Sequence, residues 1–263
     1  MSRRLRLDAD LVRRHLASSR QEAQDLIEAR RVLVNGSLAE KASRQIDPGD
    51  NVLVSGEPPR FVSRGGEKLQ AALTAFEVPV QGLSVLDAGA STGGFTDCLL
   101  QNGARGVVAL DVGHGQLHPR IRSDPRVTVM ERINIRHFDI GTTVRPDRDA
   151  PKPNDAEPFD VVVADLSFIS LTVVAGALTA ACRPGGHIIV LIKPQFEAGR
   201  REVSRGKGVI TDPEIHEVVC RTVAEAFEAE GAEVLGIIPS PLIGGHGNKE
   251  FLLHAVVRER LPK

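Results

Sequence analysis

The sequence predicts an α/β fold in which a doubly wound sheet follows a small N-terminal α+β domain. Three observations support this prediction. From about residue 63 onward, apolar runs that end in an acidic residue alternate with helical patterns. One of these runs leads into DAGASTGGF, a loop of glycine and other small residues. A segment with two prolines, at 56–62, separates this alternation from a basic first segment.

The chain therefore has three predicted parts: a domain at 1–55, a linker at 56–62 and a domain at 63–263. In the first part, apolar residues recur at helical spacing. They are Leu11, Leu16, Ala23, Leu26 and Ile27. Short strands are predicted at Val32–Val34 and Val52–Val54, and Asn35-Gly36 indicates a tight turn after the first of them.

The net charge of −1 hides an uneven distribution along the chain. Residues 1–46 carry ten Lys and Arg against six Asp and Glu, whereas the rest of the chain is net acidic. A basic module on an acidic body is typical of an appendage that binds a polyanion. The alternative interpretation is a solvated helical surface without a ligand.

Length and composition limit the class of protein. With 263 residues, the chain can bury one good core and a small second domain. No apolar run approaches the roughly 20 residues of a bilayer span, and the charged start MSRRLRLDAD lacks the apolar stretch of a secretion signal. The three cysteines, Cys98, Cys182 and Cys220, are scattered and have no CxxC spacing. We therefore expect a cytoplasmic protein without membrane association and without structural zinc.

Seven apolar runs form the predicted sheet of the second domain. They are Leu83–Asp87, Val107–Asp111, Val127–Met130, Val161–Asp165, Ile188–Ile192, Val234–Ile238 and Phe251–Val257. Helical patterns lie between them, including Leu171–Cys182 and Glu214–Glu230, and together they predict a three-layer arrangement. The segment 141–158 holds four prolines and many charges, so we expect a mobile surface loop there.

The loop from Asp87 to Phe95 is the most informative stretch of the sequence. Its small residues let a ligand approach the backbone closely. A dinucleotide site needs the spacing G-x-G-x-x-G, and Gly89, Gly93 and Gly94 are in the wrong register for it. The loop suits a ligand without phosphates whose amino-acid end lies beside Asp87, and S-adenosyl-L-methionine is such a ligand. A dinucleotide site and a sheet without a ligand are the alternatives.

Acidic residues at the ends of the next two strands complete the predicted cofactor site. Asp111, 24 residues after Asp87, can accept both ribose hydroxyls of an adenosine. Glu131 ends the third strand and leads to Asn134, which could hold the adenine edge. The full predicted set is Asp87, Gly89, Ala90, Ser91, Thr92, Gly93, Gly94, Phe95, Asp111, Val112, Glu131, Asn134 and Asp165.

Four polar residues are predicted at the carboxyl edge of the sheet: Lys68, Asp165, Lys193 and Glu250. Asp165 and Lys193 each close an apolar run, so both are expected to face the crevice where open α/β sheets bind ligands. A lysine at the end of a hydrophobic strand costs free energy unless it has a partner or a ligand. The alternative is a pair of structural ion pairs at the strand ends.

Other polar residues give weaker signals. His114, His118 and His137 lack the spacing of metal ligands, and we predict no metal site. Ser167 and Ser170 have no matched His–Asp pair, so nucleophilic catalysis by a serine is not expected.

The order of Lys68, Asp165, Lys193 and Glu250 around the glycine loop resembles the K-D-K-E tetrad of ribose 2′-O-methyltransferases of the FtsJ/RrmJ type. The first segment resembles the alpha-L RNA-binding module. The matching residues are Arg6-Leu7-Asp8, Ser19-Arg20, Ala23, Ile27, Val32, Val34-Asn35-Gly36 and Lys41. With the phrases SRGGEKL, DVGHGQL, DLSFIS, IKPQFE and GKGVITDPEIH, the chain resembles the TlyA family over nearly its whole length, apart from the proline-rich segment near 141–158.

The resemblance implies an enzyme that methylates cytidine 2′-hydroxyls of ribosomal RNA, with ribosomal subunits as partners and neither DNA nor membrane as a ligand. It also implies a set of RNA-binding residues that contact mostly phosphates. The set is Arg4, Arg6, Arg13, Arg14, Arg20, Arg30, Arg31, Lys41 and Arg64. Members often have glycine where this chain has Arg30, so the helix before it is expected to end without a left-handed glycine cap. The oligomeric state is left open.

The resemblance also assigns roles to the tetrad. A ribose 2′-hydroxyl must lose its proton as it attacks the sulfonium methyl, and Lys193 would act as the base or steer the oxygen. Asp165 would hold Lys193, while Lys68 and Glu250 would fix the ribose. Other function classes are a cytolysin, because relatives often carry the name hemolysin, a ribosome-binding assembly factor without catalysis, and a nicotinamide-dependent oxidoreductase.

Overall fold

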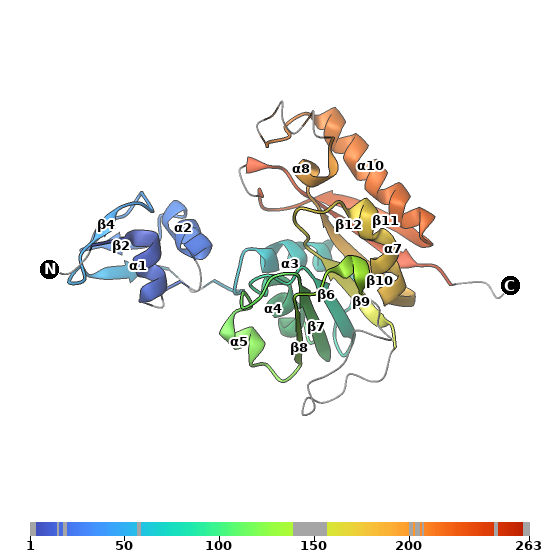
Figure 1. Ribbon diagram of the computed structural model, residues 1–263, viewed down its shortest axis with the longest axis horizontal. Coiled ribbons are helices and arrows are strands. Elements are labelled where there is room, and N and C mark those ends of the chain that lie inside the picture. The colour runs from blue at the N-terminus through green and yellow to red at the C-terminus, as the bar shows by residue number, and fades with distance from the viewer. Residues whose placement is uncertain are drawn as a thin grey trace. The chain divides into compact units, whose positions relative to one another are not determined.

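The computed structural model describes residues 4–14, 16–17, 20–56, 59–138, 157–199, 202, 206, 208–244 and 247–259. The chain divides into two compact units, residues 1–63 and 64–263 (Figure 1). The expected linker at 56–62 falls within the first unit, and the finer domain boundaries stay a prediction. The expected mobile loop at 141–158 lies outside the described residues, apart from Glu157 and Pro158.

The first unit combines helices with short strands. Its elements are β1 (Leu5–Arg6), α1 (Leu7–Arg13), α2 (Arg20–Glu28), β2 (Val32–Val34), β3 (Ser37–Leu38), β4 (Gln45–Ile46) and β5 (Val52–Val54). Strand β2 lies between β3 and β5 in an antiparallel sheet, and β1 pairs with β4. The predicted turn joins β2 to β3, with φ of 52° at Asn35 and 79° at Gly36. Leu11, Ile27 and Val32 are buried in one core.

The end of α2 keeps a left-handed residue although glycine is absent. Arg30 has a φ of 56°, in the region that favours glycine. The Arg31 N–H donates to the Leu26 carbonyl and the Arg30 N–H to the Ile27 carbonyl, both at 3.0 Å. These bonds close the helix, so the arginine adopts the conformation that a glycine would take at lower cost.

The second unit contains a seven-stranded sheet with the order β11-β12-β10-β9-β6-β7-β8. The strands are β6 (Ser84–Ala88), β7 (Gly106–Asp111), β8 (Val127–Glu131), β9 (Phe159–Ala164), β10 (Cys182–Ile192), β11 (Ala232–Pro239) and β12 (Phe251–Val257). Strands β6 to β10 pair in parallel, while β12 runs antiparallel to both β10 and β11. The strand order reverses beside β6, which confirms the predicted doubly wound sheet.

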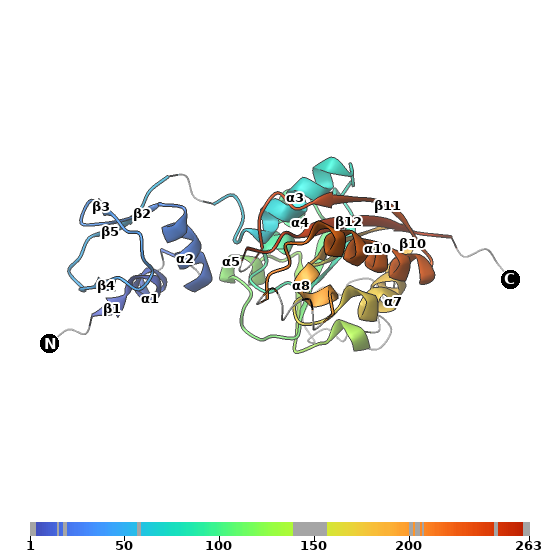
Figure 2. The ribbon, with the colours of Figure 1, turned by 90° about the horizontal axis from the view of Figure 1, so that it is seen from above.

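Helices cover both faces of this sheet. They are α3 (Gly65–Ala75), α4 (Gly94–Gln101), α5 (Pro119–Arg122), η1 (Ile135–His137), α7 (Leu171–Ala181), α8 (Pro194–Glu197) and α10 (Pro213–Ala229). Helices α3 and α4 lie on one face, and α7 and α10 on the other (Figures 1 and 2). Leu86, Val162 and Val190 of the sheet share a core with Leu178 of α7 and Phe227 of α10. The central strands are buried along their length because helices cover both faces of the sheet, as the continuous apolar runs of the sequence predict.

The longest helix shows why the sequence folds this way locally. Asp212 precedes α10 and its side chain accepts the N–H of Glu214 at 2.9 Å, while Pro213 occupies the first helical position. Gly231 follows the helix with a φ of 91°. Within the described part of the chain, no helix has the length and apolarity that a membrane span requires.

Candidate functional site

The predicted tetrad forms two lysine–carboxylate pairs. Lys193 follows β10 and its Nζ lies 2.5 Å from Oδ1 of Asp165, which follows β9. Lys68 of α3 places its Nζ 2.5 Å from Oε2 of Glu250, which precedes β12. The Lys193 and Lys68 side chains are each 12% exposed, whereas Glu250 is only 2% exposed. Each pair is thus shielded enough for its ionic contact to be stronger than one on an open surface.

The register of the sheet brings these pairs to one edge. Ile192, the last residue of β10, pairs with Phe251, the first residue of β12. Lys193 and Glu250 therefore occupy adjacent positions just beyond this strand pair. Asp165 joins them from β9, which runs parallel to β10 on its other side. The structure thus brings together the four residues that the sequence expects at the carboxyl edge.

Ser167 is a further member of this group. Lys193 Nζ donates a hydrogen bond to Ser167 Oγ at 3.0 Å. Sequence reasoning considered this serine only as a nucleophile and missed its contact with the lysine. Its position two residues after Asp165 was the available signal, because the carboxyl ends of adjacent parallel strands lie close together.

Asp87 lies at the floor of the glycine loop. It is fully buried in β6, and its Oδ2 accepts a hydrogen bond from Thr96 Oγ1 at 2.6 Å. Its Oδ1 has no hydrogen-bond partner among the described residues. Burial raises the pKa of Asp87 to about 7, and the nearby carboxylates of Asp165 and Asp111 act in the same direction against the Thr96 bond. A buried acceptor without a partner is suited to a cationic ligand group.

Two glycines of this loop are required by backbone conformation and packing, independently of any ligand. Gly89 has a φ of 85°, and a Cβ there would lie 2.6 Å from the Asp165 carbonyl oxygen. Gly93 has a φ of 93°, and a Cβ there would lie 2.9 Å from Leu117. The loop therefore passes directly against the chain that carries Asp165, which only glycine permits.

The other predicted loop residues differ in exposure. Ser91 is exposed and Thr92 half-buried, whereas Ala90, Gly94 and Phe95 are buried. Phe95 belongs to α4 and is only 3% exposed, so the structure places it in the protein core and not on an open binding surface.

Asp111 connects the glycine loop to the end of β7. Its Oδ2 accepts the N–H of Ser91 at 2.8 Å, and its Oδ1 accepts the N–H of Gly113 at 2.6 Å. A carboxylate has about four acceptor positions, so these bonds leave capacity for ligand hydroxyls. Val112 beside it is 65% exposed.

Glu131 and Asn134 are held by other groups. The Glu131 carboxylate accepts the Gly115 N–H at 2.8 Å, contacts His114 Nδ1 at 2.7 Å and pairs with Arg122. Burial alone would raise the pKa of Glu131, but the hydrogen bonds from Arg122 and Gly115 outweigh it and hold that pKa below its usual value. Asn134 begins η1, where its Oδ1 accepts the Arg136 N–H at 3.0 Å. Both residues thus have partners within the protein, and their contacts with a ligand stay predictions.

In the first unit, two buried carboxylates hold several of the predicted RNA-binding arginines. Asp8 Oδ2 lies 3.0 Å from Arg6 Nη2 and 2.9 Å from Arg20 Nη2. The hydrogen bonds from Arg6 and Arg20 hold the pKa of Asp8 well below its usual value, against the effect of burial. Both guanidinium groups are about half exposed, so they can reach a phosphate from fixed positions.

Arg14 differs from its neighbour Arg13. Both pair with the buried Asp10, at 2.6 Å in each case. Arg14 is only 21% exposed and also donates to the backbone carbonyl of Asp50 at 2.8 Å, whereas Arg13 is 50% exposed. The structure thus gives Arg14 a structural role, and the phosphate contact that the resemblance implies for it stays a prediction.

The remaining predicted RNA-binding residues have local partners or positions on the surface. Arg4 pairs with Asp47 at 3.0 Å, and Arg30 lies 3.6 Å from Glu40. Arg31 Nε donates to the Ser55 carbonyl at 2.9 Å. Lys41 is exposed, and Arg64 precedes α3 in the second unit.

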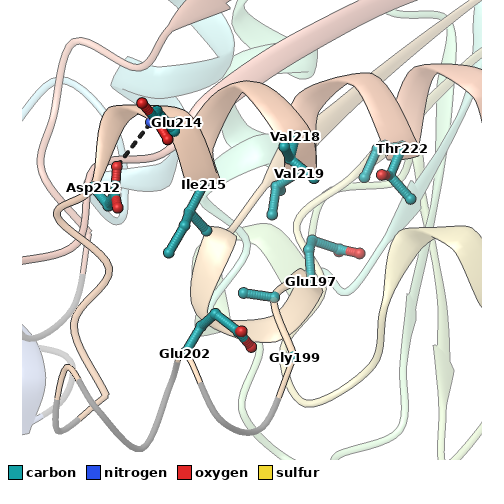
Figure 3. Close-up of a pocket in the computed structure, with 11 residues that line it drawn as sticks. Glu197, Gly199, Glu202, Asp212, Glu214, Ile215, Val218, Val219 and Thr222 are labelled. Atoms are coloured by element: carbon teal, nitrogen blue, oxygen red, sulfur yellow. Dashed lines mark hydrogen bonds between the residues drawn. The ribbon is translucent and has the colours of Figure 1, made fainter.

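A cavity of about 360 Å³ lies apart from these residues, beside α8 and α10 (Figure 3). Its lining includes Glu197, Glu202, Asp212 and Glu214 around apolar side chains of α10 such as Val219. None of the tetrad or of the glycine loop lines it. The described residues contain no cluster of three or more His, Cys, Asp or Glu side chains that could hold a metal ion.

Two family models match the chain. The FtsJ-like methyltransferase model matches residues 61–256, and the S4 domain model matches residues 5–52. The first match covers most of the chain and contains all four tetrad residues.

Relatives match over nearly the whole length. The chain is 45% identical over 257 residues to the 16S/23S rRNA (cytidine-2'-O)-methyltransferase TlyA of Mycobacterium tuberculosis, covering 96% of this chain and 90% of that protein. It is 39% identical over 253 residues to Hemolysin A of Brachyspira hyodysenteriae, covering 96% and 100%. A solved structure from Streptococcus thermophilus, provisionally described as a hemolysin, is 38% identical with a TM-score of 0.76, covering 98% and 90%.

Proposed function

The chain belongs to the FtsJ-like methyltransferase family and, within it, to the TlyA family, and we propose that it transfers the methyl group of S-adenosyl-L-methionine to a cytidine 2′-hydroxyl of ribosomal RNA. The single observation that carries this proposal is the position of Lys193. Its ammonium lies between Asp165 and Ser167 at the carboxyl edge of the sheet, where the glycine loop begins after β6.

The residues around the glycine loop fit the methyl donor. Oδ1 of Asp87, which has no partner among the described residues, can accept a hydrogen bond from the ammonium of the methionine moiety. The glycine loop contains no lysine or arginine that could bind a phosphate. Asp111 retains acceptor capacity for ribose hydroxyls, and Asn134, at the start of η1, would hold the adenine edge. When bound, the donor supplies a methyl group that its sulfonium already activates.

Lys193 acts by orienting the acceptor oxygen. An ammonium has three N–H donors: one is bonded to Ser167 Oγ, and a second faces the carboxylate of Asp165, with which Lys193 forms an ion pair. The third can bind the 2′-oxygen, align it with the methyl group and stabilise its charge as the proton leaves. Lys68 and Glu250, held together 2.5 Å apart, would position the ribose from the neighbouring strand.

The first unit would supply affinity for structured RNA. Arg6, Arg13 and Arg20 offer guanidinium groups that Asp8 and Asp10 fix in place. Such contacts bind phosphates and orient the substrate without reading its sequence. We infer that the ribosomal subunits, or their RNA, are the partners of this unit, and that the enzyme works in the cytoplasm.

The test is transfer of labelled methyl groups from S-adenosyl-L-methionine to isolated ribosomal subunits and to naked ribosomal RNA. We expect label in the RNA, resistance to alkaline hydrolysis at the modified nucleotide, and loss of both in Lys193→Ala. Donor binding should survive that substitution, because Asp87 and Asp111 keep their own hydrogen bonds to Thr96, Ser91 and Gly113. Absence of label on every RNA despite donor binding would refute the proposal, as would substantial turnover by Lys193→Ala.

A further inference from the structure

Glu197 connects the two loops that carry the tetrad residues Asp165 and Lys193. It ends α8, the single turn that follows Lys193. Ser170 Oγ donates to Glu197 Oε2 at 2.6 Å, and the Leu171 N–H donates to Glu197 Oε1 at 2.9 Å. Both oxygens of this carboxylate therefore bind the chain that follows β9.

The groups that Glu197 binds form the start of α7. The Ser170 hydroxyl also accepts the Thr172 N–H at 3.1 Å and caps the helix. The Glu197 carboxylate satisfies a further N–H of the first turn, where the helix dipole favours negative charge. Leu171 and Leu178 of α7 are buried, so this contact anchors the loop to a packed helix.

The opposite end of the same loop contacts Lys193. Asp165 and Ser167 lie 2.5 Å and 3.0 Å from its Nζ. The segment 193–197 therefore holds the segment 165–171 at two places, through Lys193 at one end and Glu197 at the other.

Apolar contacts also hold the loop between these two places: Leu166 and Ile169 pack against the core, and the Phe168 ring lies 5.2 Å from the Phe196 ring of α8. None of residues 165–170 is buried. Phe168 is 93% exposed, and its φ of 64° lies in the left-handed region that residues with a Cβ rarely adopt. Such a conformation costs about 1–3 kcal/mol and persists only where surrounding contacts impose it. The polar contacts of Lys193 and Glu197 thus fix the two ends of the loop, while the apolar contacts of its middle residues hold the part between them.

The burial of Glu197 agrees with a specific use of its charge. Burial raises the pKa of the Glu197 carboxyl, partly offset by the hydrogen bonds from Ser170 and Leu171. Figure 3 shows this side chain directed away from Glu202 and Glu214, which line the same cavity. Its carboxylate is therefore directed at the loop and not at the cavity, and a half-buried carboxylate is costly without such partners.

We propose that Glu197 is a positioning residue for methyl transfer, which fixes Ser170 and Leu171 so that Asp165 and Ser167 hold Lys193 in place. This inference rests on the proposed function of Lys193. Because Glu197 contacts no reacting atom, its loss should lower kcat and leave the KM for S-adenosyl-L-methionine unchanged. A displacement of about 1 Å at reacting groups can cost on the order of 100-fold in rate, so we expect Glu197→Ala to lower kcat by about 10- to 100-fold.

The test compares three full-length variants with the wild type. Glu197→Ala removes both acceptors. Glu197→Gln keeps an acceptor for the Leu171 N–H and offers a donor to Ser170 Oγ, so its kcat should stay within about threefold of the wild type. Glu214→Ala removes a carboxylate from the same cavity without touching the loop and should not change kcat. Methyl-transfer kinetics and amide hydrogen exchange of residues 166–172 are measured for each.

A lower kcat with unchanged KM and faster exchange in Glu197→Ala, both restored in Glu197→Gln, would support the inference. A kcat for Glu197→Ala within about twofold of the wild type, or equal exchange in all variants, would overturn it, even where the melting temperature falls. If Glu197→Ala does not fold, Ser170→Ala replaces it, because that change removes one of the two hydrogen bonds. A wild-type chain that transfers no methyl group would refute the proposed function instead, and the exchange rates would still report whether Glu197 fixes the loop.

Discussion

Ionisation of the buried Asp87 should make the stability of the protein depend on pH in a way that Asp87→Asn removes. Its pKa is about 7 in the folded protein against 3.8 as an ordinary aspartate. The folded state therefore binds more protons than the unfolded state between these values, and stability falls as pH rises from 3.8 through 7. The full difference corresponds to about 4 kcal/mol, of which roughly 2 kcal/mol is lost between pH 5.5 and pH 8.

The assay is urea unfolding of the wild type and Asp87→Asn at pH 5.5 and pH 8, without methyl donor. Asparagine can still accept the Thr96 hydroxyl, so the variant keeps the one hydrogen bond and loses the charge. The free energy of unfolding of Asp87→Asn minus that of the wild type should be about 2 kcal/mol larger at pH 8 than at pH 5.5. A difference between the two proteins that does not change with pH would refute this reasoning. The comparison cancels all other titrating groups, because both chains share them.

Two further substitutions, one in each unit, test the packing of the glycine loop and the role of Arg14, and each is compared with a control substitution. Gly89→Ala should destabilise the protein by more than the roughly 1 kcal/mol expected for an alanine in the left-handed region, because its Cβ would lie 2.6 Å from the Asp165 carbonyl oxygen. Gly82→Ala is the matched control, because Gly82 has a φ of 77° and open space around it. Both variants are compared with the wild type by thermal unfolding. Equal losses at the two positions would contradict the close approach. Arg14→Ala should cost roughly 3 kcal/mol in unfolding free energy by leaving a buried carboxylate short of a partner, whereas Arg13→Ala should mainly weaken RNA binding and reduce its salt dependence. The reverse pattern would return Arg14 to the RNA-binding surface.

The positions of the tetrad could be predicted because strand ends are a local property of the sequence. Continuous apolar runs identify β9 and β10, and the polar residue that closes each run must lie at the carboxyl edge. Asp165 and Lys193 were found in this way. Lys68 and Glu250 were expected at the same edge, but their roles came from the resemblance, and no local pattern predicts their contact, since 182 residues separate them.

The partners of individual charged groups could not be predicted in the same way. The sequence treats Glu131 as a ligand contact, yet the fold surrounds it with Arg122 and the Gly115 N–H. Arg13 and Arg14 are neighbouring arginines that the sequence does not distinguish. In the structure, Arg14 donates to the Asp50 carbonyl, and no such bond of Arg13 is seen among the described residues. Such pairings depend on distances between loops that are remote in sequence, and a shift of a few ångströms decides them.

By itself, the sequence determined the alternation of strands and helices, the glycine loop, the basic first segment and the identity of the residues at the strand ends, because hydrophobic period and chain conformation are set by near neighbours. The tertiary structure alone decided that β12 runs antiparallel beside β10 and so places Glu250 next to Lys193. It also decided that Ser167 contacts this lysine and that Glu197 reaches back to α7. Hydrogen bonds and ion pairs act over about 3 Å, and only the packed sheet and its register bring these distant segments within that range.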